Sequence, residues 1–247
     1  MLLDILLSEV VGTAMLMLLG SGVVATAVLP GSKGAPGSWL QINVGWGLAV
    51  FSAVTVSYAS GAHINPAVTL GIIATGATQF TAEVPVGWLS TFTYLGGQLI
   101  GAFLGSSLAW LAYKRQFDQE ADGAAKRACF CTTPELPGDG WAFVNELIGT
   151  FVLVFVVLGF GRAEPAGLAA LGALPVALLV VGIGTALGGP TGYAINPARD
   201  FGPRLAHAVL PIPGKVGSDW GYAWVPVLGP VTGGLLAGLA SQYLLPL

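Results

Sequence analysis

The sequence predicts an all-α membrane protein, with six transmembrane helices and two re-entrant half-helices arranged as an inverted repeat. Its 247 residues are 54% hydrophobic and only 9% charged, whereas soluble domains carry about 25% charged residues. The apolar residues gather into six long runs and two short ones. Similar motifs open both halves of the chain, so the halves are expected to share one fold in opposite orientations.

The six long runs are nearly free of charged side chains and match the length of a membrane span, about 20 residues. They cover residues 10–29, 40–59, 85–113, 141–161, 168–187 and 222–245. The first run is entered from about Leu2 without the basic segment of a signal peptide, so it is expected to remain as a span.

Each of the two short runs, residues 66–80 and 197–210, follows an Asn-Pro-Ala box that begins at Asn65 or Asn196. Asn is a strong N-cap residue and Pro is favoured at the first helical position, so each box predicts a loop that enters a helix. The Asn carbonyl oxygen would accept backbone N–H groups, which leaves the amide NH2 pointing outward as a donor. Two such caps, at the positive ends of helix dipoles, are expected to meet inside the membrane.

The repeat is also visible in two Glu-x-x-Gly-Thr motifs, at residues 9–13 and 146–150, which open the first and the fourth predicted span. Three spans separate these motifs, and this odd number turns the second half over relative to the first. We therefore predict a first repeat at residues 1–113, a connecting loop at 114–140 and a second repeat at 141–247. Small residues spaced four apart predict close helix packing in both halves. They are Gly97, Gly101 and Gly105 in the first half, and Gly229 and Gly233 in the second.

Glu9 and Glu146 are ionisable groups within spans, where such groups are costly and usually functional. They could form a proton relay, or they could accept N–H bonds from the irregular loops before the boxes. Their symmetric placement, one per repeat, favours the structural role. His63, two residues before Asn65, is interpreted as a hydrogen-bonded loop anchor.

Arg199 lies three residues after Asn196 on a short helix, and its counterpart in the first half is Val68. A buried cation beside a pore would repel cations, protons included, and would donate hydrogen bonds to neutral solutes. Asp200 suits the N-terminal turn of that helix and can pair with Arg204 four residues later.

The complete motifs are Ser-Gly-Ala-His-Ile-Asn-Pro-Ala and Gly-Tyr-Ala-Ile-Asn-Pro-Ala-Arg-Asp. On these motifs the chain resembles the major intrinsic protein (aquaporin) family, and within it the glycerol facilitator (aquaglyceroporin) branch, over essentially its whole length. The resemblance implies the aquaporin fold and a homotetramer in the lipid bilayer. It also implies a passive channel for glycerol and other small neutral solutes, with some water, that excludes ions and protons.

By the same resemblance, four positions form the selectivity filter. They are Trp46, Gly184, Tyr193 and Arg199. Water-selective members carry His at the position of Gly184, and most facilitators carry Phe at that of Tyr193. The match at Trp46 requires a one-residue gap in the loop before His63. On physical grounds, Trp46 and Tyr193 would face the carbon side of a polyol, Arg199 would bind its hydroxyls, and Gly184 would leave room.

Three further residues are marks of the glycerol branch. They are Asp200, Pro226 and Val227. Two other functions stay open at this stage: a water-selective pore of the same fold, and an ion- or proton-coupled transporter with inverted repeats.

Other classes of function lack support in the sequence. Cys129 and Cys131 form a C-x-C motif with neither histidine nearby, so free thiols are expected rather than a metal site. We find no nucleophile–base pair that would indicate an enzyme, and no cofactor motif. The net charge of -3 gives no basic surface for nucleic acid.

We expect a multi-pass protein of the cell membrane, and the resemblance implies that both termini are cytoplasmic. That orientation conflicts with the positive-inside rule, because it leaves only Arg162 on the inner side. The cations then placed outside are Lys33, Lys114, Arg115, Lys126, Arg127 and Lys215.

Overall fold

The computed structural model describes residues 1–161 and 171–245, and almost all of its regular structure is helical. The main helices are α1 (Leu2–Val28), α2 (Trp39–Ser57), α3 (Pro66–Ala74), α4 (Trp88–Ala112), α7 (Asp139–Phe160), α8 (Leu174–Leu187), α9 (Pro197–Val209) and α10 (Val225–Leu244). The shorter elements are η1 (Tyr58–Ser60), α5 (Lys114–Phe117), α6 (Gly123–Ala128), and the antiparallel strands β1 (Gln79–Thr81) and β2 (Val84–Pro85).

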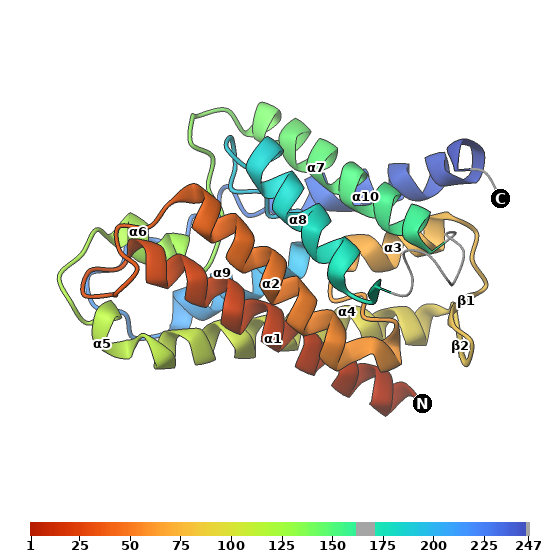
Figure 1. The fold of residues 1–247 in the computed structure, drawn as a ribbon, viewed down its shortest axis with the longest axis horizontal. Helices are drawn as coiled ribbons and strands as arrows, with labels where there is room; N and C mark the ends of the chain where they lie inside the picture. The colour runs from red at the N-terminus through yellow and green to blue at the C-terminus, as the bar shows by residue number, and fades with distance from the viewer. Residues whose placement is uncertain (162–170, 246–247) are drawn as a thin grey trace.

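The predicted all-α membrane fold is confirmed. Five of the described helices, α1, α2, α4, α7 and α10, are long and apolar enough to cross a membrane. The fifth predicted span, residues 168–187, corresponds to α8, which has 14 residues; residues 168–170 of that prediction lie outside the described residues. Figure 1 shows the N-terminus and the end of α10 at one end of the molecule, with α5 and α6 at the opposite end.

The long helices pack in matching pairs, α1 with α4 and α7 with α10 (Figure 1). A Cβ atom added to Gly105 would lie 2.2 Å from the Ala14 carbonyl oxygen, and one added to Gly233 would lie 2.3 Å from that of Leu147. Since real Cβ atoms do not approach so closely, only glycine allows these backbones to meet. The predicted close packing of both pairs is confirmed.

Each half-helix packs against a long helix from the other half of the chain. α3 lies on α10, where an added Cβ on Gly234 would be 2.4 Å from the Ala67 carbonyl oxygen. α9 lies on α4, where an added Cβ on Gly202 would be 2.7 Å from the Ala102 Cβ. The two halves of the sequence are therefore interlocked in space.

The first half-helix is shorter than predicted. It ends at Ala74, and Gly76 then adopts a φ of +79°, the left-handed conformation that commonly terminates helices. The rest of the predicted run forms the β1–β2 hairpin, in which Thr81 is paired with Val84.

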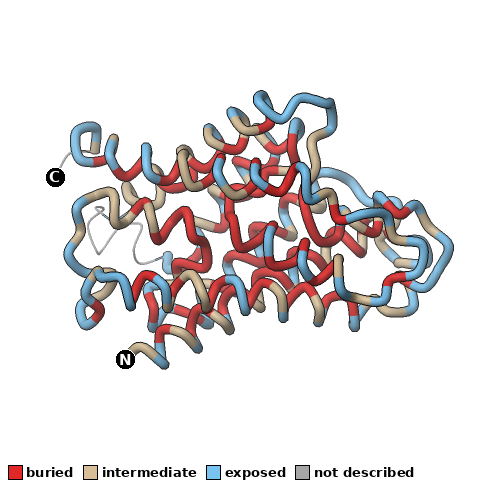
Figure 2. The backbone as a smooth tube through the Cα atoms, turned by 180° about the vertical axis from the view of Figure 1, so that it is seen from behind, coloured by how far each residue is buried: buried red, intermediate tan, exposed pale blue. Residues whose placement is uncertain are grey.

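Burial is distributed as expected for a protein whose solvent is lipid. Figure 2 shows the buried residues concentrated along the centre of the molecule and the exposed ones around its outside. The exposed set includes many large apolar side chains, such as Leu48, Leu178 and Trp88, whereas Glu9 and Glu146 are fully buried. A polar interior within an apolar exterior suits a bilayer, where charged groups face the inside of the bundle.

The segment at residues 114–140 is more than the polar connection that the sequence suggested. It contains α5 and α6, and it places Phe117, Phe130 and Cys131 in the core. Lys126 is buried too, and its ammonium donates to the carbonyl oxygens of Gln119 and Pro213 at 2.9 and 2.6 Å. These bonds fix the segment against the end of the bundle, beside the site described next.

Candidate functional site

The two Asn-Pro-Ala boxes cap the half-helices as predicted. Asn65 Oδ1 accepts a hydrogen bond from the Ala67 N–H at 2.9 Å. Asn196 Oδ1 accepts from the N–H groups of Ala198 and Arg199 at 3.0 and 3.2 Å. Pro66 and Pro197 each occupy the first helical position. The residues that start each half-helix are therefore those that the N-cap rules favour.

The boxes also bind one another. Asn65 Nδ2 donates to the Ile195 carbonyl oxygen and Asn196 Nδ2 donates to that of Ile64, both at 2.9 Å. Each amide group carries two N–H bonds, so this reciprocal contact uses one and leaves the other for a solute. The sequence-based expectation had both N–H bonds pointing outward.

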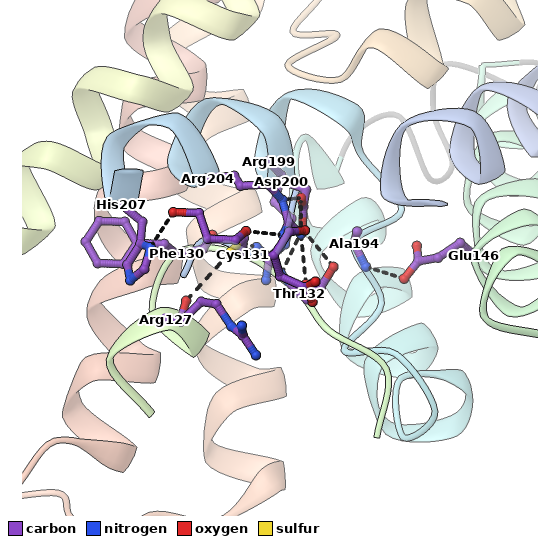
Figure 3. A network of polar contacts seen from close by, with 12 residues as sticks. Arg127, Phe130, Cys131, Thr132, Glu146, Ala194, Arg199, Asp200, Arg204 and His207 are labelled. Carbon is purple, nitrogen blue, oxygen red and sulfur yellow. Dashed lines mark hydrogen bonds and ion pairs between the residues drawn. The ribbon is translucent and has the colours of Figure 1, made fainter. Parts of the chain in front are cut away.

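Glu9 and Glu146 support the loops that approach the boxes. Glu9 accepts backbone N–H bonds from His63 and Ile64 at 3.0 and 2.7 Å. Glu146 accepts them from Ala194 and Ile195, both at 2.8 Å; the contact with Ala194 is visible in Figure 3. A hydroxyl group also donates to each carboxylate, from Ser60 to Glu9 and from Thr191 to Glu146. These contacts are the ones expected if the two carboxylates support the loops, rather than form a proton relay.

The supported loops are strained in the same way. Ile64 and Ile195, the residues before the two asparagines, have φ values of +45° and +44°. A β-branched residue rarely adopts positive φ, and such strain persists only where the surroundings impose it. The two carboxylates impose it here, because each binds the N–H group of the strained isoleucine.

His63 anchors the first loop on the side of the hairpin. Its Nδ1 lies 3.0 Å from Thr69 Oγ1 in α3. Its ring stacks on that of Tyr94 with centroids 4.3 Å apart, and Phe80 of β1 meets it edge-on at 5.3 Å. These contacts agree with the predicted role of a loop anchor.

Two cavities meet at three of the predicted filter residues. The first, of about 190 Å³, extends past Asn65 and Asn196 to His63 and is lined mainly by apolar side chains. The second, of about 260 Å³, lies beside residues 128–135 and the loop before the second box. Both cavities are lined by Trp46, Tyr193 and Arg199. These three side chains therefore stand at the boundary between the two spaces.

Arg199 is buried without a carboxylate partner among the described residues. Its guanidinium carbon lies 4.1 Å from the centroid of the Trp46 ring, and Nη1 donates to the Phe130 carbonyl oxygen at 3.4 Å. A cation above an aromatic face is stabilised by the ring quadrupole. Because a guanidinium carries five N–H donors in a fixed fork, this arrangement leaves donors for a molecule at the boundary.

The neighbouring charges form the predicted pair and continue into a network (Figure 3). Arg204 Nη2 lies 2.7 Å from Asp200 Oδ1. The other Asp200 oxygen accepts from both the N–H and the hydroxyl of Thr132, each at 2.7 Å, and Arg204 donates back to the Thr132 carbonyl oxygen at 2.9 Å. This clamp fixes the segment that presents the Phe130 carbonyl to Arg199. Neither Phe130 nor Thr132 was predicted from the sequence as part of the site.

Gly184 does not provide room for a solute, contrary to the physical interpretation above. It is not among the residues that line either cavity. An added Cβ would lie 2.7 Å from Tyr193 Cζ and 2.5 Å from Asn43 Oδ1. The space beside this glycine is therefore filled by protein, chiefly by Tyr193. Pro226 and Val227, at the start of α10, also line neither cavity.

Comparison with known proteins gives consistent matches over the whole chain. The family model for the major intrinsic protein matches residues 2–241. The probable glycerol uptake facilitator protein of Thermotoga maritima is 49% identical, over 98% of both chains. The glycerol uptake facilitator protein of Streptococcus pneumoniae is 45% identical, over 95% of this chain and 96% of that one. The X-ray structure of the aquaglyceroporin from Plasmodium falciparum has a TM-score of 0.82 and 29% identity, covering 99% of this chain and 97% of that one.

Proposed function

Because this chain belongs to the major intrinsic protein family, we propose that it is a passive membrane channel for glycerol and other small neutral solutes, with some water. The observation that carries this proposal is the boundary between the two cavities, where the aromatic rings of Trp46 and Tyr193 and the free donors of Arg199 line the same space. A polyol offers surfaces that match both, with carbon on one side and hydroxyl groups on the other. The protein is a transporter and not an enzyme.

A polyol crosses the boundary by exchanging water contacts for protein contacts. Its carbon side leaves water against Trp46 and Tyr193, while its hydroxyl oxygens accept hydrogen bonds from Arg199. Farther along, Asn65 and Asn196 each offer one N–H bond, and the walls beside them are apolar. Since a buried hydroxyl without a partner is costly, these few donors set the places where the solute pauses.

Ions and protons are excluded by the same groups. Arg199 is a fixed positive charge at the boundary, and the N-termini of α3 and α9 point their positive dipole ends at the region of the boxes. An arginine together with half-helix dipoles is a known device for excluding protons and cations from a pore. A dehydrated ion would also lose its water without gaining ligands from the apolar walls.

Two functions outside this proposal are less well supported. A water-selective pore would carry an imidazole where this chain has Gly184. In a proton-coupled transporter, the buried carboxylates would have to exchange protons, yet Glu9 and Glu146 already bind backbone N–H groups and hydroxyls.

The proposal includes a homotetramer in the cell membrane, with residues 1–113 and 141–247 as the two inverted repeats and both termini in the cytoplasm. It is supported by the family relationship, and the common side of the termini is supported by the position of the N-terminus and the end of α10 at one end of the bundle (Figure 1). The cations of α5 and α6 then lie outside; Arg162, the predicted inner cation, lies outside the described residues.

Stopped-flow light scattering of proteoliposomes tests the proposal, with water, glycerol and a larger polyol in parallel. We expect glycerol and water permeabilities well above those of empty liposomes, and none for the larger polyol. Glycerol flux should not saturate or respond to a proton gradient. A measurable ionic current, or water flux without glycerol flux, would contradict the proposal.

A further inference from the structure

The ring of Tyr193 lies in a slot between two glycines and a tryptophan. An added Cβ on Gly188 would lie 2.4 Å from Tyr193 Cδ1, and one on Gly184 would lie 2.7 Å from Tyr193 Cζ. Trp39 meets the ring edge-on, with centroids 5.8 Å apart and planes at 87°, and its Nε1 donates to the Gly184 carbonyl oxygen at 3.2 Å. These contacts hold the sides of the ring, and none of them binds its hydroxyl.

Unpartnered polar groups gather at the hydroxyl end of this slot. The Tyr193 hydroxyl has no hydrogen-bond partner among the described residues, although the side chain is buried. On α2, the Asn43 side chain is fully buried, and neither its oxygen nor its nitrogen has a partner there. The position of an added Cβ on Gly184 lies 2.5 Å from Asn43 Oδ1 and 2.8 Å from the Tyr193 hydroxyl. Both groups therefore flank the same point.

Two buried polar groups that lack partners and flank the same point can satisfy each other with a hydrogen bond. The amide of an asparagine turns about a soft terminal torsion, and the hydrogen of a tyrosine hydroxyl rotates to suit its partner. Rotation of the amide and of the hydroxyl hydrogen would therefore let the two groups satisfy each other. Asn43 lines neither cavity, so it does not compete for the solute.

We propose that Asn43 is a positioning residue for the filter, whose amide binds the Tyr193 hydroxyl behind the pore wall. The inference rests on the proposed function, because the orientation of Tyr193 matters only if solutes pass it. Bound in this way, Tyr193 presents ring carbon to the polyol beside Trp46, and its hydroxyl does not compete with the solute for Arg199. This pairing explains how tyrosine can serve in a filter wall that has to stay apolar.

The test compares the Asn43→Leu and Tyr193→Phe variants with the double variant that combines them. The readout is the ratio of glycerol to water permeability in one proteoliposome preparation, so that differences in yield cancel. In Asn43→Leu the buried hydroxyl loses its partner, so the whole ring tilts in its slot until the hydroxyl reaches the pore, where it narrows the boundary and adds a polar group. We expect the ratio to fall about fivefold, the effect of roughly one net hydrogen bond. Tyr193→Phe alone is the reference for the double variant, because it removes the hydroxyl and keeps the ring in its slot.

The double variant decides the mechanism. If Asn43 acts through the hydroxyl, Asn43→Leu has no effect once the hydroxyl is gone, so the double variant has the ratio of Tyr193→Phe alone. A double variant whose ratio falls below that of Tyr193→Phe by the same factor would show that the leucine acts through packing, and an unchanged ratio in Asn43→Leu would show no positioning role; either result overturns the inference. Gln41→Leu is the matched control, since Gln41 lies on the same helix against Gly34 and Gly37, and it should leave the ratio unchanged. Wild-type protein that conducts no glycerol would instead contradict the proposed function.

A second measurement covers the case in which Asn43→Leu folds poorly. Tyr193→Phe removes a single oxygen and leaves the Asn43 amide without its partner, so its thermal midpoint in detergent should fall. If the two groups bind each other, adding Asn43→Leu costs little more, and the effects of the two changes are not additive. Additive losses would show that the groups are independent and would overturn the inference.

Discussion

At the scale of single residues, the Arg199 guanidinium is stabilised by an aromatic face and a carbonyl oxygen, which are neutral, rather than by a carboxylate. The nearest acid in sequence, Asp200, is occupied by Arg204 and Thr132. Arg199 thus keeps a net positive charge in a buried place, which is the condition for repelling cations. Its stacking on Trp46 and its planar fork of donors are properties that lysine does not share.

Two replacements of Arg199 therefore separate the effect of its positive charge from the effect of its planar set of donors. Arg199→Ala should weaken ion exclusion and raise the proton leak, because it removes the cation and widens the boundary. Arg199→Lys keeps the charge, so proton exclusion should survive, while glycerol loses donors whose charge-assisted bonds are worth about 1.5–3 kcal/mol. Proton leak measured with a dye inside the proteoliposomes, beside glycerol flux, checks both. If Arg199→Ala leaks no more protons than wild type, Arg199 is not the barrier.

The two cysteines should be poorly reactive in the folded protein. Burial raises the pKa of the Cys129 thiol, and burial raises the pKa of the Cys131 thiol to about 12. At pH 8 the reactive thiolate of Cys131 is then on the order of a thousandfold scarcer than for a free cysteine. Iodoacetamide labelling at pH 8, followed by mass spectrometry, should modify neither residue in detergent and both after denaturation in SDS. Rapid labelling of folded protein would contradict the assignment of both as buried thiols.

Prediction from sequence succeeded at this scale for residues that belong to a recognisable motif. The Asn caps, the Asp200–Arg204 pair and the loop bonds of Glu9 and Glu146 all follow from residue type and spacing. Phe130 was missed because it acts through its backbone carbonyl, which any residue provides. The space beside Gly184 was assigned to solute because no pattern shows that Tyr193 and Asn43 fill it.

At the scale of elements, helix existence was predictable and helix length was not. Hydrophobic runs locate the spans, but α3 ends at a left-handed Gly76 well before its apolar run does. The β1–β2 hairpin, α5 and α6 are too short to leave a periodic pattern, and contacts with the rest of the fold stabilise them. The symmetric loops before the boxes are the elements on which the site depends most.

Glu9→Gln and Glu146→Gln should therefore reduce folded yield more than they change selectivity. A glutamine oxygen can accept one of the loop N–H groups, but its NH2 is a donor that faces the other. The loss is that of a buried charge-assisted bond, about 1.5–3 kcal/mol, with the φ strain of Ile64 or Ile195 left unsupported. Size-exclusion profiles and thermal midpoints in detergent measure the loss. Normal yield with altered proton coupling would instead favour the relay interpretation.

At the scale of the whole molecule, the two repeats form one unit. α3 packs on α10 and α9 packs on α4, and the asparagine of each box donates to the carbonyl oxygen before the other. A displacement of either half-helix must therefore reach the opposite box. The pore at the centre is as stable as the contact between the halves, which is made by backbones that only glycine allows to approach.

Gly234→Ala tests this coupling with a single methyl group. The new Cβ would lie 2.4 Å from the Ala67 carbonyl oxygen, so α3 must move away from α10 and carry Asn65 with it. Overpacking of this kind costs about 1–3 kcal/mol, so the thermal midpoint should fall. Because Asn65 then loses its alignment with Ile195, glycerol permeability per folded protein should fall as well.

Gly96→Ala is the matched control for that change. Gly96 also lies within a long helix, α4, but an added Cβ there would meet nothing within 4 Å. Since alanine favours a helix over glycine by about 1 kcal/mol, Gly96→Ala should be neutral or stabilising and should leave glycerol flux unchanged. If Gly234→Ala behaves like this control, then α3 has freedom to move on α10. The strain on the first half-helix would in that case not reach the second box, and the repeats would be coupled only through their asparagines.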